Sequence, residues 1–437
     1  MPNDIAIDLL GQRDAASAEV PITRWASERG GEAPHVRSLY VHVPFCFHKC
    51  HYCDFYSVVD TRDRMAPFCD RLETELDTIA HATGRPALDT IFIGGGTPTL
   101  LPPELLSRVL GAIGRAFEIR AGAEWTIEVN PETLCRERAQ VLAENGVNRV
   151  SIGAQSFHRA HLATLERHHD PDTVERAIEH ALASGIERIS VDLIYAIPGQ
   201  TLGEWAGDLE RALALPIEHL SAYALTYEPN TPMTARLHAG EFDPAPDTLE
   251  VAMYDHTLHE IRGQGFDRYE VSNHAKPGAA CRHNLAYWRG DNWLAAGPGA
   301  AGHLGGHRWT NTPRLDDYIR SGADGFAPIR EHETPDPTRM LLDRIMMGIR
   351  TRDGLDAESL RRDAADLGKQ DALDRRAAWC RAHGWLEDLG DTWTLTDGGY
   401  HFADRVAAEL MDAVSSPDGT PLTTGSAPHR ADRDASS

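Results

Sequence analysis

Cys46, Cys50 and Cys53 share one short segment with the spacing C-x3-C-x2-C, directly after the apolar stretch 39–45. Three thiolates this close can hold one iron–sulfur cluster, and they leave one iron of a four-iron cube without a protein ligand. An open coordination position is typical of a metal site that binds a small molecule, whereas a structural site is closed. The segment therefore predicts a [4Fe-4S] cluster on these three thiolates with one iron free.

A zinc site is the main alternative for this segment, with His48 or His51 as a fourth ligand. Structural zinc sites usually combine two C-x2-C pairs or end in paired histidines. The sequence has no second C-x2-C pair. Surface thiols without a function are the remaining alternative, and the cluster is favoured over both.

Composition narrows the kind of protein. The 437 residues are 41% hydrophobic, which is enough for a sizeable core, and their length predicts two to three domains. No apolar run approaches the length of a membrane span, and the N-terminus does not read as a secretory signal. The other four cysteines are scattered, which favours a reducing cytoplasm. A net charge of −23 would repel a phosphate backbone, so no nucleic-acid partner is expected.

The elements that must position the cysteines follow a β–α rhythm. Short segments rich in β-branched and aromatic residues predict strands over 38–45, 90–94, 125–129, 149–153, 188–195 and 219–226. Helical patterns lie between them, for example over 64–81, 133–145 and 171–184. Strands that alternate with helices predict a parallel sheet with right-handed crossovers. The fold class is therefore α/β, as a six-unit open barrel.

The expected domain organisation has five parts. Residues 1–33 and 413–437 lack the apolar content to offset their ordering entropy and are expected to be disordered. The barrel is expected over 34–265 and a connecting region over 266–334. Residues 335–412 read as helices plus a small hairpin, which suggests a winged-helix-like domain. Acidic residues outnumber basic ones there, so a lid or docking role is preferred over DNA binding.

Polar residues follow the predicted strands one after another. Barrels of this kind place their chemistry at the carboxyl ends of the strands. A glycine triplet, 94–96, ends the second strand, and Glu128 and Gln155 follow the third and fourth. Each has a bland alternative as a turn or an exposed strand end. Asp192 is harder to dismiss, because a carboxylate in an apolar strand is costly unless a ligand hydroxyl or a cation such as Arg167 pairs with it.

These motifs resemble the radical S-adenosylmethionine (SAM) superfamily, in which SAM chelates the free iron of the cluster. The runs 39–46, 94–99, 127–131, 153–157 and 192–201 are similar to those of the oxygen-independent coproporphyrinogen III dehydrogenase family, and the similarity spans about residues 36 to 410. The resemblance implies a partial (β/α)6 barrel. It also implies that SAM is held by Tyr40, Tyr52, Gly95, Gly96, Thr97, Glu128, Gln155, Arg167 and Asp192.

Two departures separate the chain from the true dehydrogenases. Their cluster motif continues to a fourth cysteine, where this chain has Phe55. They also carry a longer segment ahead of the barrel, where this chain has only the low-complexity 33 residues. The signature over 44–55 is instead similar to that of the heme chaperones within the same family.

A second signature of those heme chaperones, H-N-x-x-Y-W, lies at His283, Asn284, Tyr287 and Trp288. Either His283, through an imidazole nitrogen, or Tyr287, through a phenolate, has the chemistry to ligate heme iron, and Trp288 offers a flat apolar face. The alternative is that these side chains satisfy local groups and pack in the core. Other histidines, including His274, His303 and His307, remain alternative ligands.

Two functions follow from the resemblance. The first is a carrier that binds heme and transfers it to acceptor apoproteins such as those of respiratory chains. The second is a dehydrogenase that uses SAM radical chemistry to decarboxylate coproporphyrinogen III. Phe55 and the H-N-x-x-Y-W motif favour the carrier, whereas the complete set of SAM residues is also what the enzyme requires.

Overall fold

The computed structural model describes residues 17–28, 35–321 and 324–415. These residues divide into two compact units. The first comprises the described residues up to Tyr287 together with the described part of Asp291–Pro335. The second comprises Trp288–Gly290 and the described residues from Asp336 onward.

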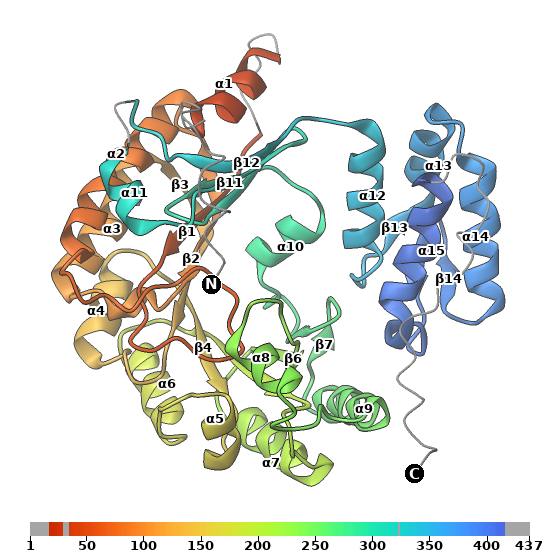
Figure 1. The fold of residues 1–437 in the computed structure, drawn as a ribbon, viewed down its shortest axis with the longest axis horizontal. Coiled ribbons are helices and arrows are strands. Elements are labelled where there is room, and N and C mark those ends of the chain that lie inside the picture. The colour runs from red at the N-terminus through yellow and green to blue at the C-terminus, as the bar shows by residue number, and fades with distance from the viewer. Residues whose placement is uncertain (1–16, 29–34, 322–323, 416–437) are drawn as a thin grey trace, which may run out of the picture. The chain divides into compact units, whose positions relative to one another are not determined.

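A parallel sheet forms the centre of the first unit (Figure 1). Six strands pair in chain order, each parallel to the next. They are β1 (Ser38–Val43), β2 (Ala87–Gly95), β3 (Glu118–Val129), β4 (Arg149–Gln155), β5 (Arg188–Tyr195) and β6 (His219–Ala224). The sheet is open, so the predicted partial (β/α)6 barrel is confirmed.

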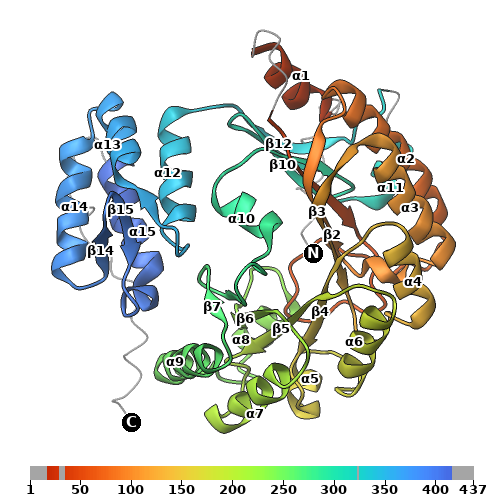
Figure 2. The same cartoon turned by 180° about the vertical axis from the view of Figure 1, so that it is seen from behind.

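Helices cover the outer, convex side of this sheet in both views (Figures 1 and 2). The first of them is amphipathic, because Phe68, Leu72, Leu76 and Ile79 are buried at helical spacing. The helices are α2 (Met65–Ala82), α3 (Pro103–Ala116), α4 (Arg136–Glu144), α5 (Arg159–Thr164), α6 (Thr173–Ala183) and α7 (Leu202–Leu213). Because the helices take the outer face, the carboxyl ends of the strands remain available for a site.

The expected connecting region is instead part of the sheet. At one edge β9 (Trp293–Ala296) pairs in parallel with β1, and an antiparallel meander follows it. At the other edge β8 (Asn273–Ala275) pairs with β6. These strands, of two to five residues, are too short for their alternation to be visible in the sequence. The remaining strands are β7 (Asp267–Arg268), β10 (Ala301–Leu304), β11 (His307–Asn311) and β12 (Ile329–Glu333).

Short helices fill the loops of the first unit. A 3-10 turn, η1 (Pro98–Leu100), follows the glycine triplet. On the concave side of the sheet lies α10 (Arg282–Trp288), which carries the H-N-x-x-Y-W motif (Figures 1 and 2). The others are α8 (Pro232–His238), α9 (Asp247–Gly263) and α11 (Leu315–Arg320).

The expected disorder of residues 1–33 is wrong for part of that segment. Residues Glu19–Glu28 form α1, and its Ile22 and Trp25 are almost fully buried. The helix also touches the sheet, because a side chain on Gly305 would lie 2.6 Å from the Trp25 ring. The few apolar residues of this short helix stand among charged and polar ones, which is too weak a pattern to predict this packing. The rest of the segment lies outside the described residues.

The second unit contains the predicted hairpin. Strands β14 (Leu386–Leu389) and β15 (Thr392–Leu395) pair with each other, and β13 (Leu355–Asp356) pairs with β15. The helices are α12 (Pro337–Gly348), α13 (Ala357–Asp366), α14 (Gln370–Ala382), η2 (Gly399–Phe402) and α15 (Ala403–Ser415). The last helix runs three residues beyond the expected boundary at 412, and the rest of the expected tail lies outside the described residues. No helix within the described ranges is long and apolar enough to cross a membrane.

Candidate functional site

The cysteine segment is a loop pinned at its base and at its tip. Cys46 donates its N–H to the Val58 carbonyl (3.0 Å), and Val58 donates to the Pro44 carbonyl (2.7 Å). Met233, from α8, donates to the His51 carbonyl (2.9 Å). All three cysteines of the loop are free thiols that are partly exposed. The loop is therefore held in place while its sulfur atoms stay reachable.

The raised pKa values of Cys46 and Cys53 indicate that their thiolates need a positively charged group between them. Burial raises the pKa of Cys46, and it raises the pKa of Cys53 to about 11. The neighbouring thiolates raise both further, so three thiolates without a metal repel one another. Thr97 Oγ1 lies 3.9 Å from Cys46 Sγ, and Arg167 Nη1 lies 3.8 Å from Cys50 Sγ. This donor set suits an iron–sulfur cluster.

The glycine triplet allows β2 to close onto this loop. Gly95 has φ +104°, and a Cβ there would lie 2.3 Å from the His42 ring. A Cβ on Gly96 would lie 2.6 Å from the Phe45 carbonyl oxygen. In the actual packing Gly96 donates to the Val43 carbonyl (2.9 Å). Only glycine fits here, and the first reason is contact with the chain itself rather than with a ligand.

Glu128 stands beside this triplet at the end of β3. Its Oε2 accepts the Gly95 N–H (3.0 Å). Burial, and then the charge of Asp192, raise the pKa of Glu128 to about 7. Tyr40 lies close by: burial raises its pKa, followed by the charges of Glu128 and Tyr287, and its hydroxyl bonds to His42 Nδ1 (3.0 Å). Glu128 is therefore an uncompensated carboxylate between the predicted SAM residues and the H-N-x-x-Y-W motif.

Asp192 is satisfied by serines rather than by Arg167. Ser221 donates to it at 2.6 Å and Ser151 at 3.0 Å. The register explains the contacts, since β6 pairs Ser221 with Asp192 and β4 brings Ser151 alongside. Burial still raises the pKa of Asp192, and these hydroxyl donors oppose the rise. The suggested pairing with Arg167 is wrong, since Arg167 bonds to the Gly153 carbonyl and faces Cys50.

Arg167 instead points to the cluster loop. It donates to the Gly153 carbonyl (2.7 Å), and its Nε has no hydrogen-bond partner among the described residues. Gln155 lies next to it because a bulge at the end of β4 gives Gln155 a φ of +64°. Tyr52 packs against the apolar cluster that contains Leu165 and Ile194. Of these predicted SAM residues, Tyr52 belongs to the cysteine loop and Arg167 contacts it at Cys50.

Side chains of the H-N-x-x-Y-W motif form hydrogen bonds with each other and with the sheet. His283 is buried, its Nδ1 bonds to Thr90 Oγ1 (2.9 Å), and its Nε2 bonds to the Tyr287 hydroxyl (2.9 Å). The ring also stacks on Phe92 at 5.4 Å. Burial lowers the pKa of His283 to about 3, so its imidazole is neutral. Tyr287 is less deeply buried, and Trp288 ends the helix.

Asn284 is linked to the site around Asp192 through a chain of hydrogen bonds. It donates to the Tyr269 hydroxyl (3.2 Å), which bonds to His219 Nε2 (2.9 Å). The other nitrogen of His219 bonds to Ser190 Oγ (2.7 Å), which lies 3.5 Å from Asp192. The alternative histidines lie elsewhere, His274 on β8 and His303 and His307 on β10 and β11.

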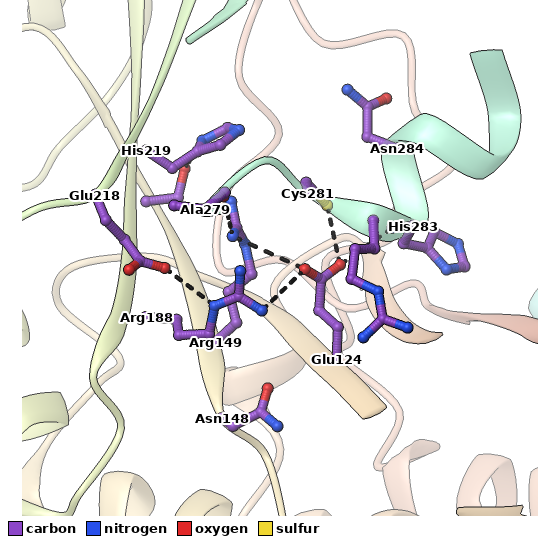
Figure 3. A network of polar contacts seen from close by, with 12 residues as sticks. Glu124, Asn148, Arg149, Arg188, Glu218, His219, Ala279, Cys281, His283 and Asn284 are labelled. Carbon is purple, nitrogen blue, oxygen red and sulfur yellow. Dashed lines mark hydrogen bonds and ion pairs between the residues drawn. The ribbon is translucent and has the colours of Figure 1, made fainter. Parts of the chain in front are cut away.

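Glu124 fixes α10 on the sheet (Figure 3). Its side chain is fully buried and accepts the His283 N–H (3.1 Å) and the Cys281 thiol (3.5 Å). Arg188 neutralises it at 3.3 Å and in turn pairs with Glu218 at 3.0 Å. Arg149, also buried, lies 3.9 Å away. Sequence reasoning missed Glu124 because it is an ordinary charged residue in a strand.

The chain is similar to a known protein family and to named proteins. The family model of the Radical SAM superfamily matches residues 40–212. The heme chaperone HemW of Bacillus subtilis (strain 168) is 35% identical over 321 residues, which cover 73% of this chain and 85% of that protein. The chain belongs to the HemW family. HemW of Mycobacterium tuberculosis (strain ATCC 25618 / H37Rv) is 34% identical over 379 residues, which cover 85% of this chain and 94% of that protein.

Among solved structures, the coproporphyrinogen III oxidase HemN of Escherichia coli, a radical SAM enzyme, shares the fold. Its TM-score is 0.76 over 89% of this chain and 92% of HemN, with 20% sequence identity. This likeness extends to both units of the chain. It concerns the fold and does not decide between the functions found within it.

Replacing Glu124 with Gln should destabilise the protein by about 3–5 kcal/mol, because the buried Arg149 would lose its ion pair with this carboxylate. The measurement is equilibrium unfolding in urea. Glu218→Gln is the matched control, since Glu218 bonds to the same Arg188 but is partly exposed; we expect a loss of about 1 kcal/mol or less. Equal losses in the two variants would contradict the central role of Glu124.

Replacing Glu128 with Gln should stabilise the protein without bound ligands, and more so at high pH. The pKa of Glu128 is higher in the folded than in the unfolded chain, so this group favours folding at pH 4 and that contribution is lost as the pH rises through 7. The gain from the substitution should be about 2–3 kcal/mol larger at pH 8 than at pH 5. Urea unfolding at both pH values measures it, and a pH-independent effect would contradict the burial of this carboxylate.

Proposed function

We propose that this protein is a heme chaperone that binds heme together with a SAM-chelating [4Fe-4S] cluster. It passes the heme to acceptor apoproteins such as those of respiratory chains. The observation that carries this proposal is the similarity to proteins named heme chaperones over 85% and 94% of their lengths. Phe55 supports it, because the dehydrogenase branch has a cysteine there; this phenylalanine is 61% exposed.

The cluster belongs on Cys46, Cys50 and Cys53. When bound, it supplies an iron with an open position for the amino and carboxylate groups of SAM. Arg167 faces Cys50 and offsets the negative charge of the thiolates. Thr97 supports Cys46 in the same way from the neighbouring strand end.

SAM would lie along the carboxyl ends of the strands. Glu128 suits the N–H groups of the amine that SAM would place on the iron, and Asp192 suits the hydroxyls of its ribose. The serines around Asp192 hold this carboxylate in one orientation without neutralising it. Contacts from the remaining residues would complete the site: Tyr40, Tyr52, Gly95, Gly96, Thr97, Gln155 and Arg167.

For heme we propose Tyr287 as the iron ligand and His283 as its partner. Both nitrogens of His283 are already hydrogen bonded, so ligation through them would break the bond to Thr90 or to Tyr287. His283 Nε2 holds the Tyr287 hydroxyl in place by a hydrogen bond (2.9 Å). Burial raises the pKa of Tyr287, so the phenolate would form when ferric iron takes the place of the proton. Trp288 would add an apolar face, and Asn284 would orient the helix through Tyr269.

The cluster and SAM assignments are tested with the anaerobically reconstituted protein. Replacing Cys46, Cys50 or Cys53 with Ala should abolish the brown absorption, whereas Cys135→Ala should keep it. SAM should perturb the paramagnetic resonance signal of the reduced cluster, and Asp192→Asn should keep the cluster but lose most of this response. Glu132→Gln, at an exposed position just after the same sheet edge, is the control. A wild-type signal unchanged by saturating SAM would refute the nucleoside site.

The heme assignment is tested by titration of heme followed through the Soret band. Tyr287→Phe should weaken binding at least tenfold, about 1.4 kcal/mol. His283→Gln should shift the band and weaken binding less, and Tyr227→Phe, a tyrosine away from the motif, should match the wild type. If His283→Gln weakens heme binding more than Tyr287→Phe does, His283 is the ligand. Efficient anaerobic conversion of coproporphyrinogen III to protoporphyrinogen IX would replace the chaperone by the dehydrogenase function.

A further inference from the structure

Next to the cysteine loop lies a second group of metal-binding side chains. His48 stands between Cys46 and Cys50, and it faces Glu166 and His168 from the segment that joins α5 to α6. The ligand atoms of the three side chains all lie within 4.8 Å of one another. Glu166 Oε2 is 3.8 Å from His48 Nε2 and 4.0 Å from His168 Nε2.

The chemistry of this group suits a zinc-like ion. Two imidazoles and one carboxylate are a ligand set of zinc sites that keep a fourth position open. Metal–ligand bonds of about 2.0–2.1 Å in tetrahedral geometry put neighbouring ligand atoms about 3.4 Å apart. The two distances from Glu166, 3.8 and 4.0 Å, are slightly longer, and all three ligand atoms lie within 4.8 Å of one another. His48 Nε2 is shielded from solvent and has no hydrogen-bond partner among the described residues.

The backbone presents these side chains on one side and Arg167 on the other. Glu166 has φ +56°, a left-handed conformation that a non-glycine residue adopts at a cost of about 1–2 kcal/mol. Glu166 and His168 reach toward His48, whereas Arg167 between them reaches toward Cys50. The three-residue segment therefore contacts two sites at once.

We propose that His48, Glu166 and His168 bind one divalent transition-metal ion, with Zn²⁺ as the best match, at a site distinct from the cluster. The ion uses two imidazole nitrogens and one carboxylate oxygen, and water takes the open position. It ties the cysteine loop to the segment around Arg167. This site does not depend on the heme or SAM assignments, because none of its ligands belongs to either set.

The test uses the full-length protein with its cluster in place. After removal of loosely bound metal, Zn²⁺ is added, and uptake is measured by equilibrium dialysis with elemental analysis. We expect one zinc per chain, X-ray absorption with nitrogen and oxygen ligands at about 2.0–2.1 Å and no sulfur, and a rise in melting temperature. His48→Asn and Glu166→Gly should weaken uptake at least tenfold, and His238→Asn, at an exposed position outside the group, should not.

Glu166→Gly separates metal binding from folding. Glycine relieves the left-handed backbone, so this variant should melt no lower than the wild type without zinc and should lose the zinc-dependent rise. Its iron content and brown absorption should stay at wild-type levels. Sulfur ligands at about 2.3 Å would place the zinc on the cysteines and overturn the proposal. Equal zinc uptake by the wild type and Glu166→Gly would mean adventitious binding and would overturn it as well.

Discussion

One buried carboxylate, that of Glu124, fixes the position of α10 on the sheet of the first unit. Glu124 is fully buried, and a charge in that position is tolerated only when it is paired and hydrogen bonded. Its partners come from β4, β5 and the start of α10, so satisfying this one charge fixes where the helix meets the sheet. The H-N-x-x-Y-W motif has its position because Glu124 accepts the His283 N–H.

Two sets of interactions, one electrostatic and one of hydrogen bonds, connect α10 with the carboxylates at the strand ends. Tyr287 and Tyr40 share the electrostatic field of Glu128, and Asn284 reaches Asp192 through Tyr269, His219 and Ser190. The motif and the predicted SAM residues are therefore neighbours in one polar network. Burial raises the pKa of Tyr287, and the charges of Cys281 and then Glu128 raise it further.

The cysteine loop depends on a different constraint, which is close packing. The glycines at the end of β2 let that strand approach the His42 ring and the Phe45 backbone, where a methyl group would collide. Backbone bonds at Val58 and Met233 then close the loop from both sides. Arg167 lies beside the Cys50 thiol, and His48, between Cys46 and Cys50 in the sequence, faces Glu166 and His168.

The sequence by itself determined the local features: the cysteine spacing, the six parallel strands, the glycine triplet and the C-terminal hairpin. Each is encoded in neighbouring residues, through periodicity or turn chemistry. Only the tertiary structure decided that serines satisfy Asp192, that α1 packs through Trp25, that β8 and β9 extend the sheet and that Glu124 holds α10. These contacts join residues far apart in the chain, 159 positions for Glu124 and His283, so no local pattern records them.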